Sequence, residues 1–403
     1  MTPERFQTLP EATWPRLRGL LDVDAPAAVE GRTGPINMTI GEPKHPFPDW
    51  LPDLMARHSG GWGKYPDNNG LPVLREAIAA WILRRYGVSV DPDTQVMALN
   101  GTREGLFGAA LALCPDDKGG RRPKVLIPNP FYPVYGVASL AVRAEPVYVA
   151  ATRETGFLPD YASLSEDVLR DTAICYICSP ANPQGTVADE AYWRRLFELA
   201  ERYDFRIFSD ECYSEIYRHA PPPGALEMAH KLGADPERVV IFHSLSKRSN
   251  LPGLRSGFVA GGPRSMAEIK RLRATAGAPL PNPIQEVSAA VWADEAHVVT
   301  NRQQYFDKFE VADHIFAGFE GYHSPDAGFF LWLPVTPYGG DGEATASALW
   351  RQAGVRTLPG AYLAREVDGK NPGADYIRVA LVAPKDEMAQ GLQLIRDHLK
   401  NDT

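Results

Sequence analysis

The stretch SLSKRSNLPGLRSG, residues 244–257, gathers hydroxyl, amine and guanidinium groups directly after the apolar run VVIFH. In open α/β sheets, ligands bind beyond the carboxyl ends of strands, so this loop is placed to touch one. Ser244, Ser246 and Arg255 carry donors that hold a phosphate in charge-assisted hydrogen bonds. Lys247 lies among them. An amine that is partly desolvated beside a second cation has a lowered pKa and can form a Schiff base with a carbonyl compound.

Two further stretches place polar side chains after strand-like runs: SDECYSEIY (209–217) and SPANPQGT (179–186). Asp210 would face the same crevice, where a buried carboxylate needs a positive partner, and a protonated pyridine nitrogen would provide one. Tyr213, one turn later, and Asn182, held between prolines, could both hydrogen-bond to a phenolic oxygen. Taken singly, each also fits a plain structural role, as a core aromatic or as a turn residue.

Two loops complete a pocket. NGTREGLF (100–107) passes from a strand through Gly101 into a helical pattern, which presents free N–H groups and the positive end of a helix to an anion. NPFYPVY (129–135) offers Tyr132 at another strand end, where its ring could stack on a planar ligand, although a core aromatic is the alternative. Together these groups meet the separate demands of one planar, phosphorylated carbonyl cofactor.

Short apolar runs must position these loops. They occupy residues 95–99, 124–127, 146–149, 172–177, 206–209, 239–243 and 257–260, with helical stretches between them. Several are apolar throughout, as expected of strands covered by helices on both faces, so the sequence predicts an α/β fold with a mostly parallel sheet. Helical spacing follows Pro72, and Asp189 is placed to cap a helix that runs to Tyr203.

The pattern changes after the last of these runs. The later elements are helical stretches at 286–297, 301–316 and 385–400 and the strand-like GFFLWLP and YIRVALV. We expect a large domain over residues 46–281, a smaller α+β domain over 282–403, and an N-terminal segment, 1–45, that packs on the smaller domain. The sequence shows no internal repeat and no low-complexity linker.

Length and composition exclude several classes of protein. The chain has 403 residues, 44% hydrophobic and 23% charged, which is typical of a folded globular protein of roughly two to three domains. The 42 Lys and Arg against 50 Asp and Glu give a net charge of -8, so no basic field attracts nucleic acid. No apolar run approaches the roughly 18 residues of a membrane span and no signal peptide is recognisable, so we expect a cytoplasmic protein that acts on small molecules.

The four cysteines make no disulfide framework in a chain of this length. Cys175 and Cys178 stand close together, but a strand turns them to opposite faces, and neither Cys114 nor Cys212 has a second pair beside it. We therefore expect buried structural thiols and no metal site.

The chain resembles fold-type I, class I/II aminotransferases of the aspartate aminotransferase superfamily at their pyridoxal-phosphate site. The resemblance is carried, in chain order, by Asn182, by Asp210 with Tyr213, and by the SLSK segment with Arg255. The resemblance covers nearly the whole chain and implies a large domain with a seven-stranded, mostly parallel sheet beside a smaller α+β domain. It implies that Lys247 bonds covalently to pyridoxal 5'-phosphate, that Asp210 meets the ring nitrogen, and that Tyr213 and Asn182 meet the O3' oxygen. The phosphate then falls to Thr102, Ser244, Ser246 and Arg255 with the backbone N–H groups of Gly101 and Arg103.

The same resemblance assigns Arg378, in YIRVAL, to the α-carboxylate of the substrate. An arginine between apolar strand residues is costly unless an anion pairs with it. Gly41, in IGEPKHPFP, would make a close backbone contact to that carboxylate, and Asn182 would lie beside it. Tyr65 resembles the tyrosine that reaches the cofactor phosphate of the other subunit, which implies a homodimer whose active sites need two chains.

An enzyme of this kind moves an amino group from an amino acid to a keto acid in two half-reactions, with Lys247 as general base and acid at the substrate Cα. As whole strings, IGEPKHPFP, NGTREGLF and SLSKRSNLPGLRSGF look most like bacterial N-succinyldiaminopimelate aminotransferases of lysine biosynthesis. Glutamate would then be the donor and N-succinyl-2-amino-6-ketopimelate the keto acid. Aspartate enzymes read the side-chain carboxylate of the substrate with an arginine shortly before a PNP-like turn. ATAGAPLPNP (274–283) has no arginine, which argues against a dedicated aspartate enzyme. Lys44, Arg103 and Arg273 are candidates for reading the distal part of the substrate.

Other functions stay open at this point. A class I enzyme for aspartate, alanine or an aromatic amino acid would share these motifs. A pyridoxal-phosphate lyase or decarboxylase could use the same Lys247 and Asp210, since the bond broken depends on how the substrate stands over the ring. A ligand-sensing regulator with an aminotransferase-like domain is a further alternative, but the sequence shows no N-terminal helix-turn-helix and is acidic.

Overall fold

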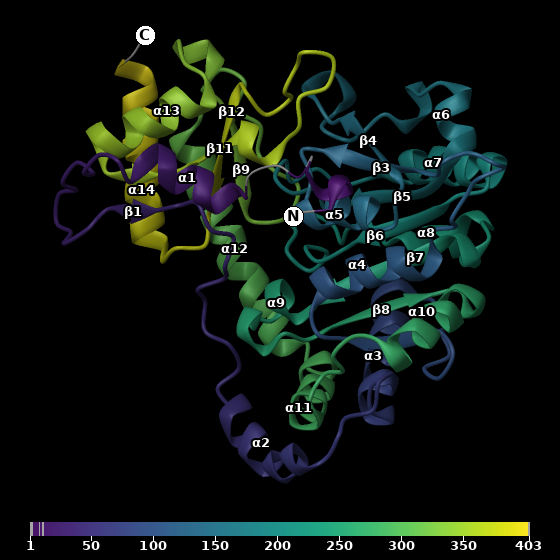
Figure 1. Cartoon of the computed structure of the whole chain (residues 1–403). Helices are drawn as coiled ribbons and strands as arrows, with labels where there is room; N and C mark the ends of the chain where they lie inside the picture. The colour runs from purple at the N-terminus through teal and green to yellow at the C-terminus, as the bar shows by residue number, and fades with distance from the viewer. Residues whose placement is uncertain (1–2, 8, 10–11, 402–403) are drawn as a thin grey trace.

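The computed structural model describes residues 3–7, 9 and 12–401. Its largest element is a seven-stranded sheet (Figure 1). In sheet order the strands are β2 (Val96–Leu99), β8 (Gly257–Gly261), β7 (Val239–Ser244), β6 (Arg206–Asp210), β5 (Thr172–Cys178), β3 (Lys124–Asn129) and β4 (Glu145–Ala150). Neighbouring strands pair in parallel except at β8, which is antiparallel to both β2 and β7. The mostly parallel α/β sheet predicted from the apolar runs is confirmed.

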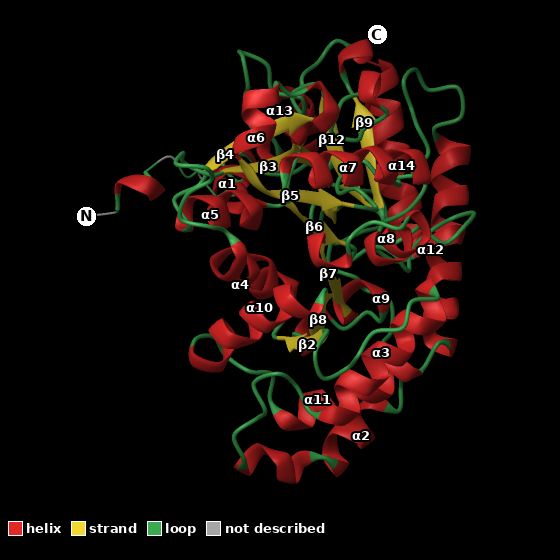
Figure 2. Cartoon of the chain, turned by 90° about the vertical axis from the view of Figure 1, so that its right-hand side faces the viewer, coloured by secondary structure: helices red, strands yellow, loops and turns green. Residues whose placement is uncertain are grey.

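Helices cover both faces of this sheet (Figure 2). One face carries α3 (Pro72–Tyr86), α6 (Glu166–Asp171), α7 (Glu190–Tyr203) and α8 (Ala225–Leu232), and the other carries α4 (Thr102–Leu113), α5 (Pro133–Ala141) and α10 (Pro263–Thr275). Successive strand residues point to opposite faces, so Ile207 packs in one core cluster and Phe208 in the other. As expected, Asp189 caps α7 and accepts the Tyr192 N–H at 2.7 Å.

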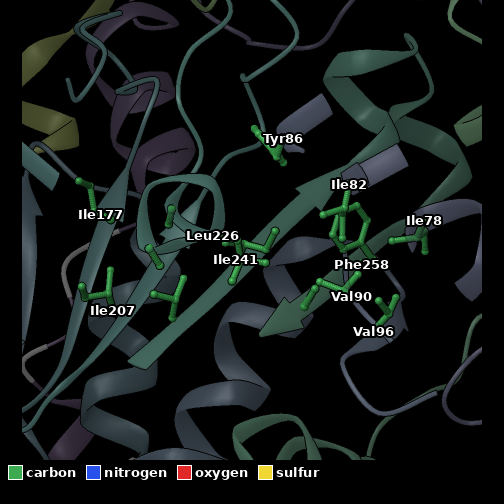
Figure 3. Close-up of a cluster of buried hydrophobic side chains, with 14 of the residues drawn as sticks. Ile78, Ile82, Tyr86, Val90, Val96, Ile177, Ile207, Leu226, Ile241 and Phe258 are labelled. Carbon is green, nitrogen blue, oxygen red and sulfur yellow. The ribbon is translucent and has the colours of Figure 1, made fainter. Parts of the chain in front are cut away.

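The larger core cluster lies between the sheet and α3 (Figure 3). Ile78 and Ile82 of α3 are fully buried with Phe258 of β8. Val287 and Trp292 of α11 (Asn282–Ala293) belong to the same cluster. The sequence pattern predicts this helix in the second domain, because the helix follows the last apolar run of the sheet. Since its buried face packs on α3, we propose that the large unit extends through α11.

A smaller unit, at the upper left of Figure 1, is built from helices and short strands. Its elements are β1 (Ile36–Asn37), α12 (Ala296–Ile315), β9 (Phe330–Pro334), α13 (Gly342–Ala348), β10 (Val355–Arg356), β11 (Leu358–Pro359), β12 (Tyr376–Ala380) and α14 (Lys385–Asn401). β11, β12 and β9 form an antiparallel sheet, and β1 pairs in parallel with β10. Ile36 and Met38 of the N-terminal segment lie in the core of this unit.

Three short helices connect or flank the two units. α1 (Thr13–Leu21) packs on the smaller unit, α2 (Leu51–Arg57) lies beside α11 at the bottom of Figure 1, and α9 (Leu245–Arg248) follows β7 directly. None of the helices in the described part of the chain is long and apolar enough to cross a bilayer.

Candidate active site

A cavity of about 550 Å³ lies where the carboxyl ends of the large sheet meet the smaller unit. Among the residues predicted to hold the cofactor or the α-carboxylate, all except Gly101 and Tyr65 line it, namely Gly41, Thr102, Arg103, Tyr132, Asn182, Asp210, Tyr213, Ser244, Ser246, Lys247, Arg255 and Arg378. These residues come from segments that are up to several hundred positions apart in the chain. The sheet therefore brings together the groups that the sequence motifs singled out.

The residues predicted to hold a phosphate lie at one part of this cavity. Gly101, with φ 84°, precedes α4, which begins at Thr102. A Cβ at position 101 would overlap the guanidinium of Arg255, so a residue without a side chain is required there. The Ser244 hydroxyl donates to the Ser246 Oγ at 2.9 Å and accepts the Ser246 N–H at 3.1 Å. A helix N-terminus, a guanidinium and hydroxyl groups are a donor set that suits a phosphate.

Lys247 presents its amine to the cavity. Its Nζ donates to the carbonyl oxygen of Gly41 and lies 5.1 Å from the centroid of the Phe329 ring. Burial, together with the positive charges of Arg378 and Arg255, lowers the pKa of Lys247 to about 8. An appreciable share of the amine is therefore neutral near physiological pH, and the neutral form is the one that attacks a carbonyl carbon.

Asp210 ends β6 and is buried in the cavity wall. The Tyr135 hydroxyl donates to its Oδ2 at 2.8 Å, and the Cys212 N–H donates to its Oδ1 at 3.3 Å. Burial raises the pKa of Asp210, although these hydrogen bonds act in the opposite direction. A cationic ligand group beside Asp210 would stabilise its ionised form.

Tyr135 is a functional candidate that the sequence analysis missed. It is fully buried and its ring stacks on Tyr176, with 4.5 Å between the centroids. A tyrosine in the apolar helix α5 has the pattern of a core residue. Only its contact with Asp210, 75 positions away, distinguishes it.

A chain of hydrogen bonds joins Tyr213, Asn182 and Arg378. Asn182 Nδ2 donates to the Tyr213 hydroxyl at 3.4 Å, and Arg378 Nη1 donates to Asn182 Oδ1 at 3.2 Å. Arg378 also donates to the carbonyl of Thr39 at 2.8 Å and stands 4.2 Å from the Phe330 ring centroid. Its Nε has no hydrogen-bond partner among the described residues, and burial lowers its pKa to about 10. A buried guanidinium with a free donor is a site for an anionic ligand group.

The three cations predicted to read the distal part of a substrate lie in different surroundings. Arg103 lines the cavity and its Nε donates to the Tyr132 hydroxyl at 2.7 Å. Lys44 is exposed and does not line the cavity. Arg273 is buried and forms an ion pair with Glu104, so it is a structural charge rather than a substrate contact. Arg103 alone of the three stays a candidate.

The outer wall of the cavity comes from segments that the motifs did not indicate. Trp14 of α1 contributes to it, as do Phe157 and Leu158 from the loop after β4. Leu17 and Leu21 anchor α1 in a small core cluster with residues of the smaller unit. The N-terminal helix therefore reaches the cavity through tertiary packing that no local pattern reveals.

Two cysteines differ from the expectation of purely structural thiols. Cys175 is fully buried, but Cys178 and Cys212 line the cavity. The Cys212 Sγ lies 3.3 Å from the Thr102 Oγ1. Burial raises the pKa of both cavity thiols well above the usual value, which disfavours the reactive thiolate form.

Tyr65 lies outside the cavity. Its side chain is fully exposed, and its carbonyl oxygen accepts a hydrogen bond from Asn282 Nδ2 at 3.4 Å. The structure therefore does not bring Tyr65 together with the other predicted residues within one chain.

Comparisons with known proteins agree with this geometry. The family described as aminotransferase class I and II matches residues 33–395. An LL-diaminopimelate aminotransferase of Syntrophobacter fumaroxidans is 31% identical over 375 residues, which is 90% of each chain.

Solved structures show the same likeness in three dimensions. The crystal structure of an aminotransferase from Neisseria meningitidis superposes with a TM-score of 0.90 at 38% identity, covering 97% of this chain and 98% of that one. A probable N-succinyldiaminopimelate aminotransferase from Thermus thermophilus gives a TM-score of 0.80 at 25% identity, covering 98% and 100%. The match to the family extends over most of the chain and includes every residue that lines the cavity except Thr13 and Trp14. The chain belongs to the class I and II aminotransferases, whose members use pyridoxal phosphate.

Proposed function

We propose that this enzyme transfers an amino group between glutamate and N-succinyl-2-amino-6-ketopimelate. The observation that carries the aminotransfer chemistry is that the Lys247 amine lines the same cavity as the buried Arg378, whose Nε has no partner among the described residues. A substrate bound through its α-carboxylate at Arg378 would present its amino group and Cα to Lys247.

Several features of the cavity fit pyridoxal phosphate. The guanidinium of Arg255 lies so close to Gly101 that a Cβ at position 101 would overlap it, and this places a cation at the start of α4, where a phosphate would bind. The raised pKa of Asp210 reflects a buried carboxylate whose ionised form a protonated ring nitrogen would stabilise. We infer that Thr102, Ser244, Ser246 and Arg255 hold the phosphate and that Tyr132 lies against the ring.

When bound, pyridoxal phosphate supplies a carbonyl carbon for the amino nitrogen and a ring that accepts electrons from the substrate Cα. Lys247 would bond covalently to its carbonyl carbon, and the Lys247 Nζ, when free, would carry a proton to and from the substrate Cα. Asp210 would keep the ring nitrogen protonated, while Tyr213 and Asn182 would hydrogen-bond to the ring oxygen.

The substrate carboxylate is the role that we propose for Arg378. Asn182 and the carbonyl of Thr39 hold its guanidinium from two sides, and Phe330 packs against it. We propose that Gly41, which lines the cavity, approaches the same carboxylate; a Cβ at position 41 would collide with Phe330. Because these contacts hold the Arg378 guanidinium in place, a carboxylate bound to it would be oriented with its Cα toward Lys247. Such orientation is a way in which a binding residue raises the reaction rate.

Arg103 is the residue that we propose for recognising the distal part of the substrate. Arg103 is the cation at the cavity that remains once Arg255, Arg378 and Lys247 are assigned. It would meet a carboxylate far from Cα, as in an acylated diaminopimelate. The curated relative from Syntrophobacter favours a second candidate, the keto form of diaminopimelate without the succinyl group.

We propose further that the enzyme acts as a homodimer. Tyr65 is fully exposed and follows α2, which projects from the body of the chain at the bottom of Figure 1. An exposed tyrosine on such a segment is placed to enter a neighbouring subunit. Sedimentation of the active enzyme would show a dimer, and a fully active monomer would refute the shared site.

Measuring kcat/KM for a panel of keto acids, with glutamate as donor, tests the substrate. We expect N-succinyl-2-amino-6-ketopimelate to be the best acceptor. A preference for the unacylated compound would select the second candidate. An aromatic or branched-chain keto acid preferred by about tenfold, equivalent to about 1.4 kcal/mol in transition-state binding, would overturn the lysine-pathway proposal while leaving aminotransfer intact.

A further inference from the structure

Asn301 lies in the second turn of α12, the longest helix in the described part of the chain, is only 3% exposed, and makes four hydrogen bonds. Its Oδ1 accepts from Asn250 Nδ2 and from His45 Nδ1, both at 3.0 Å. Its Nδ2 donates to the carbonyl oxygens of Lys247 and Arg248, both at 3.3 Å. An amide can accept two hydrogen bonds and donate two, so the capacity of this buried side chain is fully used.

The two carbonyls that Asn301 binds close the short helix α9. The last carbonyls of a helix have no partner within it, and α9 has only four residues. The chain turns away directly afterwards, at Asn250, whose φ is 54°. Asn301, on α12, therefore donates hydrogen bonds to two backbone carbonyls at the end of α9, those of Lys247 and Arg248.

The side-chain amine of Lys247 contacts residues 41–46, the same segment that Asn301 contacts. Its Nζ donates to the carbonyl of Gly41, while His45, four residues later, binds Asn301. Asn250 Nδ2 also donates to the carbonyl of Pro46 at 3.2 Å. Residues 41–46 thus contact both the amine of Lys247 and, through Asn301, its backbone.

Aromatic rings form a second route between these groups. The His45 ring packs on Tyr305, with 4.5 Å between centroids, and Tyr305 stacks on Phe329 at 5.4 Å. Phe329 is the ring that lies beside Lys247 Nζ. Burial and the neighbouring Lys308 lower the pKa of His45, which favours the neutral imidazole, and the neutral ring donates through one nitrogen only.

We propose that Asn301 is a positioning residue for Lys247: it fixes the backbone from which the amine extends and couples that backbone to residues 41–46. The inference rests on the proposed function, because it takes Lys247 as the amine that bonds to pyridoxal phosphate. Asn301 does not line the cavity. Its effect would appear in how fast the amine reaches a bound carbonyl, not in how tightly the phosphate is held.

The rate of covalent capture measures this effect directly. The full-length chain is freed of cofactor, mixed with pyridoxal phosphate and quenched with borohydride at successive times. The lysine nitrogen bonds to the aldehyde carbon with loss of water, and hydride then reduces the carbon–nitrogen double bond to a secondary amine. Peptide mass spectrometry identifies the labelled lysine, and equilibrium dialysis reports total binding of the cofactor.

Three variants separate positioning from general stability. Asn301→Ala removes all four hydrogen bonds, and Asn301→Asp keeps the volume and the two acceptor contacts but loses the donors to the Lys247 and Arg248 carbonyls. Gln303→Ala, an exposed position on the same helix, is the matched control. We expect capture to slow by about tenfold in both Asn301 variants, which corresponds to about 1.4 kcal/mol, with cofactor binding changed by less than about threefold. Gln303→Ala should match the wild type.

The outcomes distinguish the inference from the proposal beneath it. Label on a lysine other than Lys247 would reject the assignment of Lys247 itself. Label on Lys247 at an unchanged rate in a folded Asn301 variant would reject the positioning role alone. If Asn301→Ala does not fold, Asn301→Asp decides, and an Asp variant that captures at the wild-type rate overturns the proposal.

Discussion

The inner and outer ends of the cavity are built in different ways. At the inner end, Asp210 and Ser244 are the last residues of neighbouring strands, and Lys247 follows within one turn. At the outer end, the wall comes from Trp14 of a helix near the N-terminus and Phe157 of a loop. The reaction chemistry is therefore tied to the edge of a sheet, whose register fixes it, whereas substrate selection falls to segments attached by packing. Substitutions at the inner end should affect every substrate alike, and those at the outer end should change the preference among substrates.

Lys247→Ala should give the largest effect, a fall in turnover of about 10⁴-fold or more, because it removes both the nucleophile and the carrier of the Cα proton. The variant should still fold and bind pyridoxal phosphate, since Arg255 and the serine hydroxyls remain. Steady-state assays with glutamate and equilibrium dialysis check both points. A variant that transaminates near the wild-type rate would exclude this role for Lys247.

Asp210→Ala should slow removal of the Cα proton by about 10²- to 10³-fold. The reason is that a buried carboxylate stabilises the protonated form of the ring nitrogen opposite it by about 3–5 kcal/mol. The loss should be the same for every amino donor. Rapid mixing with glutamate, protonated or deuterated at Cα, measures this step. An unchanged rate would mean that Asp210 does not meet the ring nitrogen.

Arg378→Leu should raise KM for glutamate by about 10²-fold, because a charge-assisted pair with the α-carboxylate contributes about 1.5–3 kcal/mol. Leucine fills the apolar setting beside Phe330 without leaving a charge. Total binding of pyridoxal phosphate, measured by equilibrium dialysis, should be unaffected, which makes it the control. A KM that stays at the wild-type value would move the carboxylate site elsewhere.

The lowered pKa of Lys247 predicts how covalent capture depends on pH. Since the neutral amine attacks and its pKa is about 8, the rate should rise with pH through that value. Between pH 7 and pH 9 the neutral fraction increases about tenfold, whereas an amine with an ordinary lysine pKa would gain nearly a hundredfold. The capture rate as a function of pH, measured in the cofactor-free chain, distinguishes the two curves.

Arg103→Ala should give the smallest effect, and only at the outer end. Its guanidinium is exposed, so its charge contributes at most about 1 kcal/mol, equivalent to about fivefold in kcat/KM for an acceptor with a distal carboxylate. Pyruvate, which has no such group, should react as with the wild type. Equal losses for both acceptors would show that Arg103 acts on the cofactor rather than on the substrate.

The inner end could be predicted from the sequence because strand-end position and chemical type coincide there. Asp210 and Lys247 each follow an apolar run, and each has a charge that needs a partner. Tyr135 could not be found in this way, because a buried tyrosine in an apolar helix has no local mark of its contact with Asp210. Arg273 had the right charge for a substrate contact, but Glu104, 169 positions away, neutralises it.

The fold shows the same division. The strands of the large sheet were predicted to within one or two residues, because unbroken apolar runs are typical of strands buried on both faces. The domain boundary at residues 281–282 stays a prediction, and our proposal that α11 belongs to the large unit differs from it for a physical reason: amphipathic spacing shows that a helix has a buried face, but not which surface covers it. That surface is α3, which comes some two hundred residues earlier.

A single half-reaction tests the central claim most directly. The holoenzyme is mixed with glutamate and no acceptor, and the products are counted against the number of chains. Because the amino group stays on the enzyme until a keto acid arrives, we predict one 2-oxoglutarate per chain, a matching change in the absorbance of the bound cofactor, and neither ammonia nor carbon dioxide. Continuous release of ammonia or carbon dioxide without an acceptor would identify a lyase or a decarboxylase and contradict the aminotransfer function.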